Sequence, residues 1–433
     1  MFLCGVAEHQ PPWRVGNYRP ATSRVRPQKK PSSAILYEGA TQLPFLAQEQ
    51  FFRFYSLMKH FFLTSLTAST MLGMLLAGCQ SGSQEAGSTA QAPTDSTAIS
   101  TPATTSPSVV LELVAQNNRQ WTGITIAPNG RRFVNFPRWS ADVPVSVAEL
   151  LPDGTTKPWP DAARNAWQPG ASPDQKFACV QSVVADSKNR LWVVDPNNSE
   201  FKGVLPAGPR LHVFDIASSK LLRTYKFPAG TWNKQSYLND VRVDVARNVA
   251  YLTDSGSGAL LAVELGSGQV HRQLATDSVT KPNLPYLTFN GEKWTKQVHS
   301  DGIELSGSGD TLYFSVLTGD KLFRVPTRLL RRATPTDSLH AAVQTVATIG
   351  PADGLWRTRD GRIWSGALTS DAIRVTNPRT GQVSDVVKDA RIRWADTFAE
   401  DANGYIYFTT SQLQYEPTKR GKYEIYRFRP QGK

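Results

Sequence analysis

The sequence predicts an all-β protein whose folded part, residues 108–433, is a six-bladed β-propeller. The first observation behind this prediction is a pattern of paired short strands that recurs six times. The second is composition: 29 Pro, 31 Gly and 10% aromatic residues favour strands and turns over long helices, and 40% apolar residues exclude a disordered chain. The third is a strand before the first copy that has no partner in a unit of its own. Four-stranded units repeated at this period are typical of a propeller, in which each blade covers the faces of its neighbours.

Each copy of the repeat begins with a polar residue, continues with a short β-rich run and a polar turn, and ends in a strand centred on an aromatic residue. The six copies begin at Thr122, Gln181, Asn239, Asp301, Asp353 and Asp396. The matching aromatic residues are Phe133, Trp192, Tyr251, Tyr313, Trp364 and Tyr407. Asn-Gly and Asp-Gly dipeptides in several of the turns are hairpin signals. A β-sandwich or jelly roll is the alternative architecture, but neither predicts six aligned aromatic residues.

Further strands follow most copies and bring each unit to four. After the third, fourth and fifth copies they are expected at 259–265, 269–274, 321–326, 343–349, 372–376 and 382–387. The sixth copy ends after residues 424–428, its third strand. We therefore expect the N-terminal strand at 109–115 to pair with this last blade and to close the ring.

A secretion signal precedes the propeller, at residues 58–78. Met58 and Lys59 are followed by an apolar run, 61–77, which is shorter than the roughly 20 residues of a membrane span. The run ends in Leu-Ala-Gly-Cys79, which resembles the bacterial lipobox. Cleavage before Cys79 and lipidation of its sulfur would make the protein an extracytoplasmic, membrane-anchored bacterial lipoprotein. The alternative is a buried helix followed by an ordinary thiol.

The segments on either side of the signal have separate interpretations. Residues 79–107 begin with the lipidated cysteine and are otherwise rich in Ser, Thr, Ala, Gln, Gly and Pro, so they are expected to form a flexible tether. Residues 1–57 lie upstream of a complete signal, and we expect them to be an untranslated extension.

Charge and cysteine content exclude several functional classes. The 48 Lys+Arg exceed the 36 Asp+Glu to give a net charge of +12, but the basic residues are dispersed and form no nucleic-acid motif. Three cysteines are too few for a disulfide framework, and Cys179 is expected in the core. Serine hydrolase, kinase and zinc protease motifs are missing. We expect a monomer that takes a small-molecule ligand, touches a membrane only through its N-terminal lipid, and binds no nucleic acid.

The first residues of the six copies form the candidate ligand-binding site. If the copies superpose, these residues begin the innermost strands and face one mouth of the central channel. Three of them are carboxylates, which together favour a cation, either a metal ion or an amine. His299 and Asp301 are the candidate catalytic residues, with His299 as a general base at neutral pH. The alternative for each Asp is structural, as a turn cap or an acceptor between blades.

Four motifs carry a resemblance to a known family. They are Tyr237-Leu-Asn-Asp240, the run from His299 to Ser306, the run from Leu312 to Gly319, and Trp394-Ala-Asp-Thr-Phe398. Over residues 111–430 the chain resembles a bacterial member of the major royal jelly protein/Yellow family. The resemblance implies a six-bladed propeller, usually secreted, with a small-molecule pocket at one end of the channel. Some insect members bind biogenic amines, and others act on dopachrome.

The motifs at Asn239 and Asp301 are also similar, more distantly, to the regucalcin/gluconolactonase family. That resemblance implies a divalent cation such as calcium on the channel axis, held by Glu, Asn and Asp, and the opening of lactones. Asn239 and Asp301 match two of these ligands, but Thr122 stands in place of the Glu. Such a site should be weak unless Asp353 or Asp396 also turns inward.

Two functions of different classes follow from the sequence. The first is a propeller that binds a small cationic or aromatic molecule at the mouth of its channel. The alternative is a metal-assisted enzyme that opens a lactone or rearranges a quinone-like substrate. A third reading, a scaffold that binds proteins through its outer rim, stays open because fold alone does not decide function.

Overall fold

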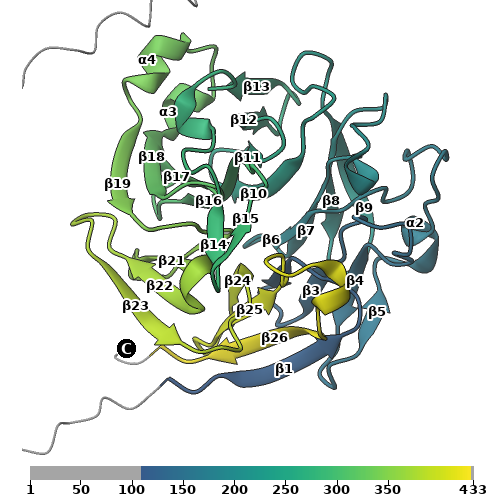
Figure 1. The fold of residues 1–433 in the computed structure, drawn as a ribbon. Coiled ribbons are helices and arrows are strands. Elements are labelled where there is room, and N and C mark those ends of the chain that lie inside the picture. The colour runs from purple at the N-terminus through teal and green to yellow at the C-terminus, as the bar shows by residue number, and fades with distance from the viewer. Residues whose placement is uncertain (1–108, 431–433) are drawn as a thin grey trace, which may run out of the picture. The chain divides into compact units, whose positions relative to one another are not determined.

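The computed structural model describes residues 109–430, and these form six four-stranded antiparallel sheets around a central axis (Figure 1). This confirms the predicted six-bladed propeller. The predicted signal, the lipidated Cys79 and the tether lie outside the described residues. Within residues 109–430, no helix is long and apolar enough to cross a membrane.

The blades follow one another along the chain, and within each blade the strands pair in sequence order from the axis outward. Blade 1 consists of β2 (Ile124–Ile126), β3 (Arg132–Asn135), β4 (Val147–Leu150) and β5 (Thr156–Pro158). Blade 2 consists of β6 (Ser182–Ala185), β7 (Arg190–Asp195), β8 (Arg210–Asp215) and β9 (Leu221–Lys226). Blade 3 consists of β10 (Leu238–Asp244), β11 (Val249–Asp254), β12 (Ala259–Glu264) and β13 (Val270–Gln273).

Blades 4 and 5 have the same order, and blade 6 has three strands from the end of the chain. Blade 4 consists of β16 (Ser300–Leu305), β17 (Thr311–Val316), β18 (Lys321–Pro326) and β19 (Gln344–Thr348). Blade 5 consists of β20 (Leu355–Arg357), β21 (Ile363–Ala367), β22 (Ala372–Thr376) and β23 (Val383–Lys388). The three strands of blade 6 are β24 (Ala395–Glu400), β25 (Ile406–Thr410) and β26 (Tyr423–Phe428).

The outermost strand of blade 6 is β1 (Glu112–Asn117), which comes from the N-terminal end of the propeller. It pairs antiparallel with β26, and an Arg427–Glu112 ion pair of 2.7 Å links the two strands. The strand begins three residues later than the 109–115 expected from sequence and continues to Asn117, with a register shift after Leu113. On the inner side, the first strands of adjacent blades contact one another around the axis, including β2 with β24.

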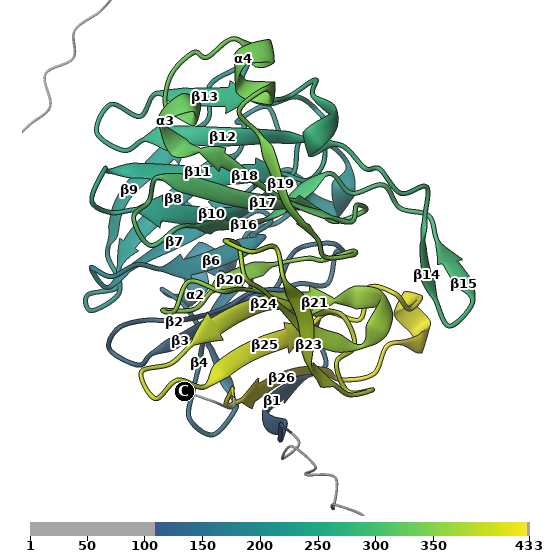
Figure 2. The same ribbon diagram turned by 90° about the vertical axis from the view of Figure 1, so that its left-hand side faces the viewer.

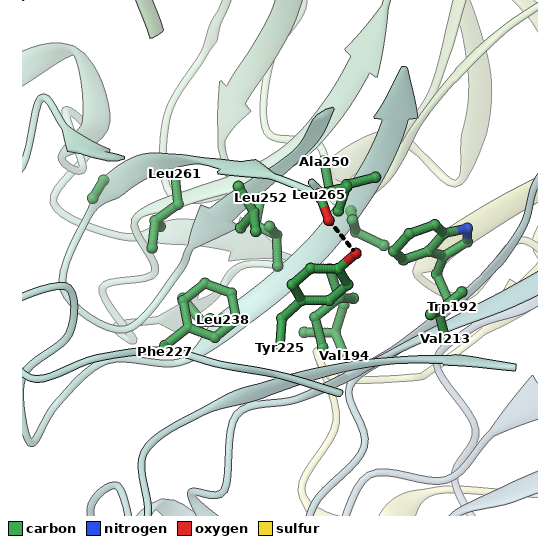
Figure 3. Packing of buried hydrophobic residues seen from close by; sticks show 14 residues of the cluster. Trp192, Val194, Val213, Tyr225, Phe227, Leu238, Ala250, Leu252, Leu261 and Leu265 are labelled. Atoms are coloured by element: carbon green, nitrogen blue, oxygen red, sulfur yellow. Dashed lines mark hydrogen bonds between the residues drawn. The ribbon is translucent and has the colours of Figure 1, made fainter. Parts of the chain in front are cut away.

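The aromatic residues at the matching places of the repeat are all buried, as predicted. Figure 3 shows the packing between blades 2 and 3, where Trp192 and Tyr225 face Leu252. The Tyr225 hydroxyl donates a hydrogen bond of 2.9 Å to the carbonyl of Leu265, so its polar end is satisfied within the apolar layer. A buried aromatic of this size typically contributes about 3 to 5 kcal/mol relative to alanine. The repeat therefore encodes the contacts between blades.

Several elements lie outside the four-stranded pattern. A hairpin of β14 (Leu287–Phe289) and β15 (Glu292–Trp294) leaves the chain between blades 3 and 4 and projects from one face of the ring (Figure 2). The short helices are α2 (Ala162–Asn165), α3 (Thr327–Leu330) and α4 (Thr336–His340), and the 3-10 turns include η1 (Ser199–Phe201) and η3 (Leu368–Ser370). The sequence pattern did not identify the hairpin, because it interrupts the repeat rather than belonging to it.

Candidate functional site

The innermost strands carry irregularities at the predicted site residues. The pairing register shifts between Leu238 and Val241 in β10, between Ser300 and Ile303 in β16, and between Ala395 and Phe398 in β24. A bulge leaves a residue outside the regular ladder and changes the direction of its side chain. Because Asn239, Asp301 and Asp396 sit within these irregularities, their side chains are released from strand pairing and can face the channel.

The glycines that follow two of the aspartates are required by the closeness of adjacent blades. A Cβ added to Gly302 would lie 2.3 Å from the carbonyl oxygen of Asp353, and one added to Gly354 would lie 2.3 Å from that of Asp396. The Gly354 N–H also donates a 2.8 Å hydrogen bond to the Asp396 carbonyl. The Asp-Gly pairs thus bring the main chains of neighbouring blades together, while the carboxyl groups remain available to the channel.

Five of the six predicted residues line one cavity of about 960 Å³ at a mouth of the channel. They are Gln181, Asn239, Asp301, Asp353 and Asp396. Thr122 is not among the lining residues, because its hydroxyl joins blades 1 and 2: it accepts a hydrogen bond from the Asn135 amide (2.9 Å) and donates to the carbonyl of Gln181 (3.3 Å). The repeat alignment therefore brings five of the six residues to one cavity, and their role in ligand binding stays a prediction.

Three carboxyl groups form what we call the floor of the cavity: those of Asp301, Asp353 and Asp396. They are buried and close enough to influence one another. Burial raises the pKa of Asp301 and of Asp396 well above the ordinary aspartate range, and the charge of Asp353 raises both further. Burial also raises the pKa of Asp353, to about 6, although hydrogen bonds from the Trp394 indole and from Asp301 act to lower it. The three carboxyl groups thus interact as one group in which burial favours protonation of each member, while the indole hydrogen bond favours the ionised form of Asp353.

A separate ion-pair network lies next to this floor in the channel. Arg242 of blade 3 donates to the carboxylate of Asp240 (2.8 Å), to that of Glu304 in blade 4 (3.1 Å) and to the carbonyl of Leu355 in blade 5 (2.7 Å). Burial opposes the charge of Arg242, but Asp240 and Glu304 together raise its pKa above the usual range. Arg242 and Glu304 occupy the same place in two copies, three residues after the first residue, and this spacing was the signal that sequence reasoning missed.

Aromatic side chains form one wall of the cavity. The Trp139 indole donates a 2.6 Å hydrogen bond to the Tyr237 hydroxyl, which in turn donates to Gln181 (3.1 Å). The Phe201 ring lies 5.1 Å from that of Tyr237 and 5.8 Å from that of Trp139, yet its side chain is 61% exposed. Trp294 of the hairpin also lines the cavity. Trp139 and Phe201 lie on loops outside the repeat, so no sequence signal marked them.

Basic residues also line the cavity. They are Arg119, Lys202, Lys234, Lys296 and Arg420, and Arg119 is paired with Asp142, another lining residue. The cavity lining thus combines buried carboxyl groups, aromatic rings and basic side chains.

His299, the candidate general base, does not line this cavity. Its ring is half-buried, and Nδ1 has no hydrogen-bond partner among the described residues. Burial and then the charge of Lys281 lower the pKa of His299, whose carboxylate neighbour is Asp254 rather than the floor. Strand alternation, which would put residues two apart on one side, does not extend to His299 because β16 begins at Ser300.

Cys179 is buried, as predicted for a core residue. Burial raises the pKa of its thiol to about 12. A thiol of this kind stays protonated at neutral pH and is a poor nucleophile.

The calcium site implied by the regucalcin-like resemblance does not match the observed residues. Thr122 uses its hydroxyl between blades, and Asp301 forms a hydrogen bond with Asp353. Among residues 109–430, no three His, Cys, Asp or Glu side chains are arranged to hold a metal ion. The three-ligand set of Glu, Asn and Asp is therefore not reproduced here.

The fold and the cavity together define a six-bladed propeller with a cavity of about 960 Å³ at one channel mouth. The profile of the major royal jelly protein family matches residues 178–432, which is more than half of the chain. The protein belongs to this family. Protein yellow of Drosophila madeirensis is 25% identical over 240 residues, and that of Drosophila melanogaster is 27% identical over 237. Each alignment covers 48% of this chain but only 40% and 42% of the respective relative, so the chain spans about two fifths of their length.

Solved structures of similar shape include lactonase-like propellers. A gluconolactonase from Xanthomonas campestris is 14% identical, with a TM-score of 0.48, and the match covers 74% of this chain and 89% of that one. A luciferin-regenerating enzyme is 10% identical with a TM-score of 0.49 over 75% and 96% of the two chains. A calcium-binding regucalcin from Agrobacterium tumefaciens is 14% identical with a TM-score of 0.46 over 73% and 93%.

Proposed function

We propose that this protein binds a small aromatic cation in the channel cavity, with the cationic group against Asp353 and the ring against the aromatic wall. The observation that carries the proposal is the convergence of three buried carboxyl groups from different blades at the floor of one cavity of about 960 Å³. This volume is in the range of small-molecule sites.

The floor supports a singly charged group rather than a metal ion. The indole hydrogen bond favours the charged form of Asp353, while burial and the charge of Asp353 favour protonated Asp301 and Asp396, which in that form can donate hydrogen bonds. An ion pair in a buried site is stronger than one in water because screening is weaker. The basic residues of the lining oppose the entry of a molecule with several positive charges.

The wall supports an aromatic ligand. Phe201 is a large apolar side chain that remains mostly exposed although its ring already stacks near Tyr237 and Trp139. An aromatic ligand would cover that exposed face and gain stacking, which is worth about 0.5 to 1.5 kcal/mol beyond area burial. A cationic group near these rings would gain a cation–π contribution as well.

Calorimetric titration of the purified protein with phenethylamine and with its neutral analogue 2-phenylethanol tests the proposal. We expect the amine to bind at least about tenfold more tightly, since a charge-assisted hydrogen bond is worth about 1.5 to 3 kcal/mol. The titrations are repeated with a chelator and with added calcium, and we expect the same affinity in both. Equal affinity for the amine and the alcohol, or binding that requires calcium, would contradict the proposal.

A second candidate function, rearrangement of a quinone-like substrate, is favoured by the hydrogen bond between Asp301 and Asp353. One protonated and one ionised carboxyl group form an acid–base pair. The Asp353 carboxylate would take a proton from a carbon beside a carbonyl, and Asp301 would give its proton to the carbonyl oxygen. The product is an isomer of the substrate. An absorbance assay with an aminochrome tests this function: acceleration that is lost in both Asp301→Asn and Asp353→Asn supports it.

We also propose that the protein is exported and anchored through a lipid on Cys79. This proposal is supported by the sequence alone, namely by the apolar run, the Leu-Ala-Gly-Cys motif and the polar segment that follows.

A further inference from the structure

We propose that Trp394 is a positioning residue for Asp353 and that the β14–β15 hairpin, by holding Trp394 in place, sets the affinity of the cavity for a cation. The inference rests on the proposed function for its binding readout.

The hydrogen bond joins two blades at the cavity floor. The indole nitrogen of Trp394, the residue just before β24, lies 2.7 Å from a carboxylate oxygen of Asp353, which precedes β20 in blade 5. The Trp394 side chain is fully buried. An indole N–H can only donate, so it favours a carboxylate over a protonated acid at this position. It also fixes which oxygen of Asp353 is turned away from the ligand.

The backbone of Trp394 adopts a conformation that its side chain disfavours. Its φ is +65°, in the left-handed region, where a bulky residue is an outlier. Such a conformation persists only where surrounding contacts hold it. One contact is the hydrogen bond from the Ser411 N–H to the Trp394 carbonyl (3.1 Å).

The other contacts come from the hairpin. The rings of Trp294 and Phe289 lie 5.2 Å and 5.5 Å from the Trp394 ring. Trp294 also donates a 3.1 Å hydrogen bond to the carbonyl of Leu413, which follows β25 in blade 6. The hairpin leaves the ring between blades 3 and 4, so these contacts extend it to blade 6. The same Trp294 lines the cavity, which connects the hairpin to the ligand directly.

The groups around Asp353 make the indole N–H important for keeping its carboxyl group ionised. Asp301, Asp396 and Asp240 are its carboxyl neighbours, and Arg242 is paired with Asp240 and Glu304 instead. The two side-chain donors to Asp353 among the described residues are Trp394 and Asp301. Loss of the indole N–H removes a neutral donor without changing any charge. Protonation of Asp353 should then begin at a higher pH, and cation binding should be lost there as well.

Trp394→Phe in the full chain tests the inference, because phenylalanine keeps an aromatic ring for the cluster and removes the N–H. Phenethylamine affinity is measured across a pH series. We expect an affinity roughly tenfold lower near neutral pH, in line with the loss of one hydrogen bond to a charged group, and a pH midpoint of binding that moves upward. The matched control is Trp192→Phe, which also removes an indole N–H from a buried tryptophan that donates to a carboxylate, but that carboxylate is Asp186 and neither residue lines the cavity. Its midpoint should stay at the wild-type value.

Phe289→Ala tests the role of the hairpin, because Phe289 contacts Trp394 but is not among the residues that line the cavity. We expect a smaller upward shift of the same midpoint. An unchanged midpoint in Trp394→Phe overturns the assignment of Trp394, and an unchanged midpoint in Phe289→Ala overturns the part assigned to the hairpin. Should Trp394→Phe fail to fold, Phe289→Ala alone decides, and a midpoint that does not move overturns the inference.

A readout without ligand separates this inference from the proposed function. Aspartate labelled with ¹³C at the carboxyl carbon is incorporated, the Asp353 signal is assigned with Asp353→Asn, and its chemical shift is followed against pH. If no amine binds to the wild type, the proposed function fails, yet a higher Asp353 midpoint in Trp394→Phe still supports the positioning role. If the amine binds and the Asp353 signal titrates identically in both proteins, the positioning role is overturned while the proposed function stands.

Discussion

The indole of Trp394 donates a 2.7 Å hydrogen bond to Asp353, and this contact distinguishes one carboxyl group from its two neighbours at the cavity floor. Asp301 and Asp396 occupy equivalent places in their blades, but no indole donor to either is recorded among the described residues. A ring of similar side chains thus acquires one preferred site of negative charge. The first two predictions follow from this difference.

Asp353→Asn should weaken phenethylamine binding by about 1 to 3 kcal/mol at near-neutral pH, because it removes the carboxylate whose ionised form the Trp394 indole favours. Asp301→Asn should have a much smaller effect, since burial and the charge of Asp353 raise the pKa of Asp301 and favour its protonated form, and an amide can still donate to Asp353. Calorimetric titration of both variants checks the ratio. Losses of equal size would mean that the charge is shared, and a larger loss in Asp301→Asn would reverse the assignment.

The pH dependence of stability should change in Asp353→Asn with a defined sign. The pKa of Asp353 is raised in the native state to about 6, above the unfolded value of about 3.9, so the native state binds more protons in this window. This carboxyl group therefore stabilises the fold more as pH falls through about 6, and the contribution is lost as pH rises.

Denaturant unfolding of wild type and Asp353→Asn between about pH 4.5 and pH 7.5 checks this sign. The wild type should lose free energy of unfolding relative to the variant as pH rises. Asp153→Asn is the control, because Asp153 is solvent-exposed and its hydrogen bonds with Thr155 lower its pKa, which places its titration below this range. A constant difference between wild type and Asp353→Asn would contradict the raised pKa.

The blade order and most of the floor could be predicted from the sequence because the repeat is imposed by packing. Aromatic residues such as Tyr251 and Trp364 recur at one place because each blade must fill the space beside its neighbour. The Asp-Gly pairs that begin at Asp301 and Asp353 share a glycine because no larger residue fits where the main chains of adjacent blades meet. The same reasoning failed for Thr122, whose hydroxyl bonds between blades.

The rest of the site could not be predicted because it comes from segments without a period. Phe201 lies in a turn with positive φ, and Trp294 belongs to the inserted hairpin. The protonation of Asp353 depends on its burial and on the Trp394 donor, and the spacing of residues in the sequence reveals neither. Arg242 could have been found, because Glu304 occupies the equivalent place in the next copy.

Gly302→Ala should destabilise the protein by about 1 to 3 kcal/mol, the usual cost of forcing an atom into a packed interior. The added Cβ would lie 2.3 Å from the Asp353 carbonyl, which belongs to the adjacent blade. Gly266→Ala is the matched control, because the nearest atom to its added Cβ is 3.6 Å away and its φ is not in the left-handed region. Denaturant unfolding measures both. Equal stability of the two variants would mean that the blades can separate at this point without cost.

Cys79→Ser should release the protein from membranes, since serine offers no sulfur for lipidation. Fractionation of cells that express the full chain checks this, and mass spectrometry of the wild type should find the lipid on the residue 79 peptide. The control is Ser81→Ala, which changes the same polar segment without touching the cysteine. Continued attachment of Cys79→Ser to membranes would show that the lipobox interpretation is wrong.

Removal of residues 109–117 should destabilise the propeller by several kcal/mol, a large part of the roughly 5 to 15 kcal/mol available to a typical domain. The deletion takes away β1, the outermost strand of blade 6, together with the Glu112–Arg427 ion pair. It exposes β26 as an unpaired edge and uncovers the apolar layer to which Leu111 and Ala115 contribute.

Deletion of residues 80–107 is the control for this experiment, because the predicted tether should contribute nothing to folding. Glu112→Gln tests the ion pair alone and should cost no more than about 1 kcal/mol, the usual limit for a partly exposed pair. Denaturant unfolding of the three variants separates strand pairing from charge. If the protein without residues 109–117 unfolds at the wild-type midpoint, β1 contributes no stability and β26 is tolerated as an edge.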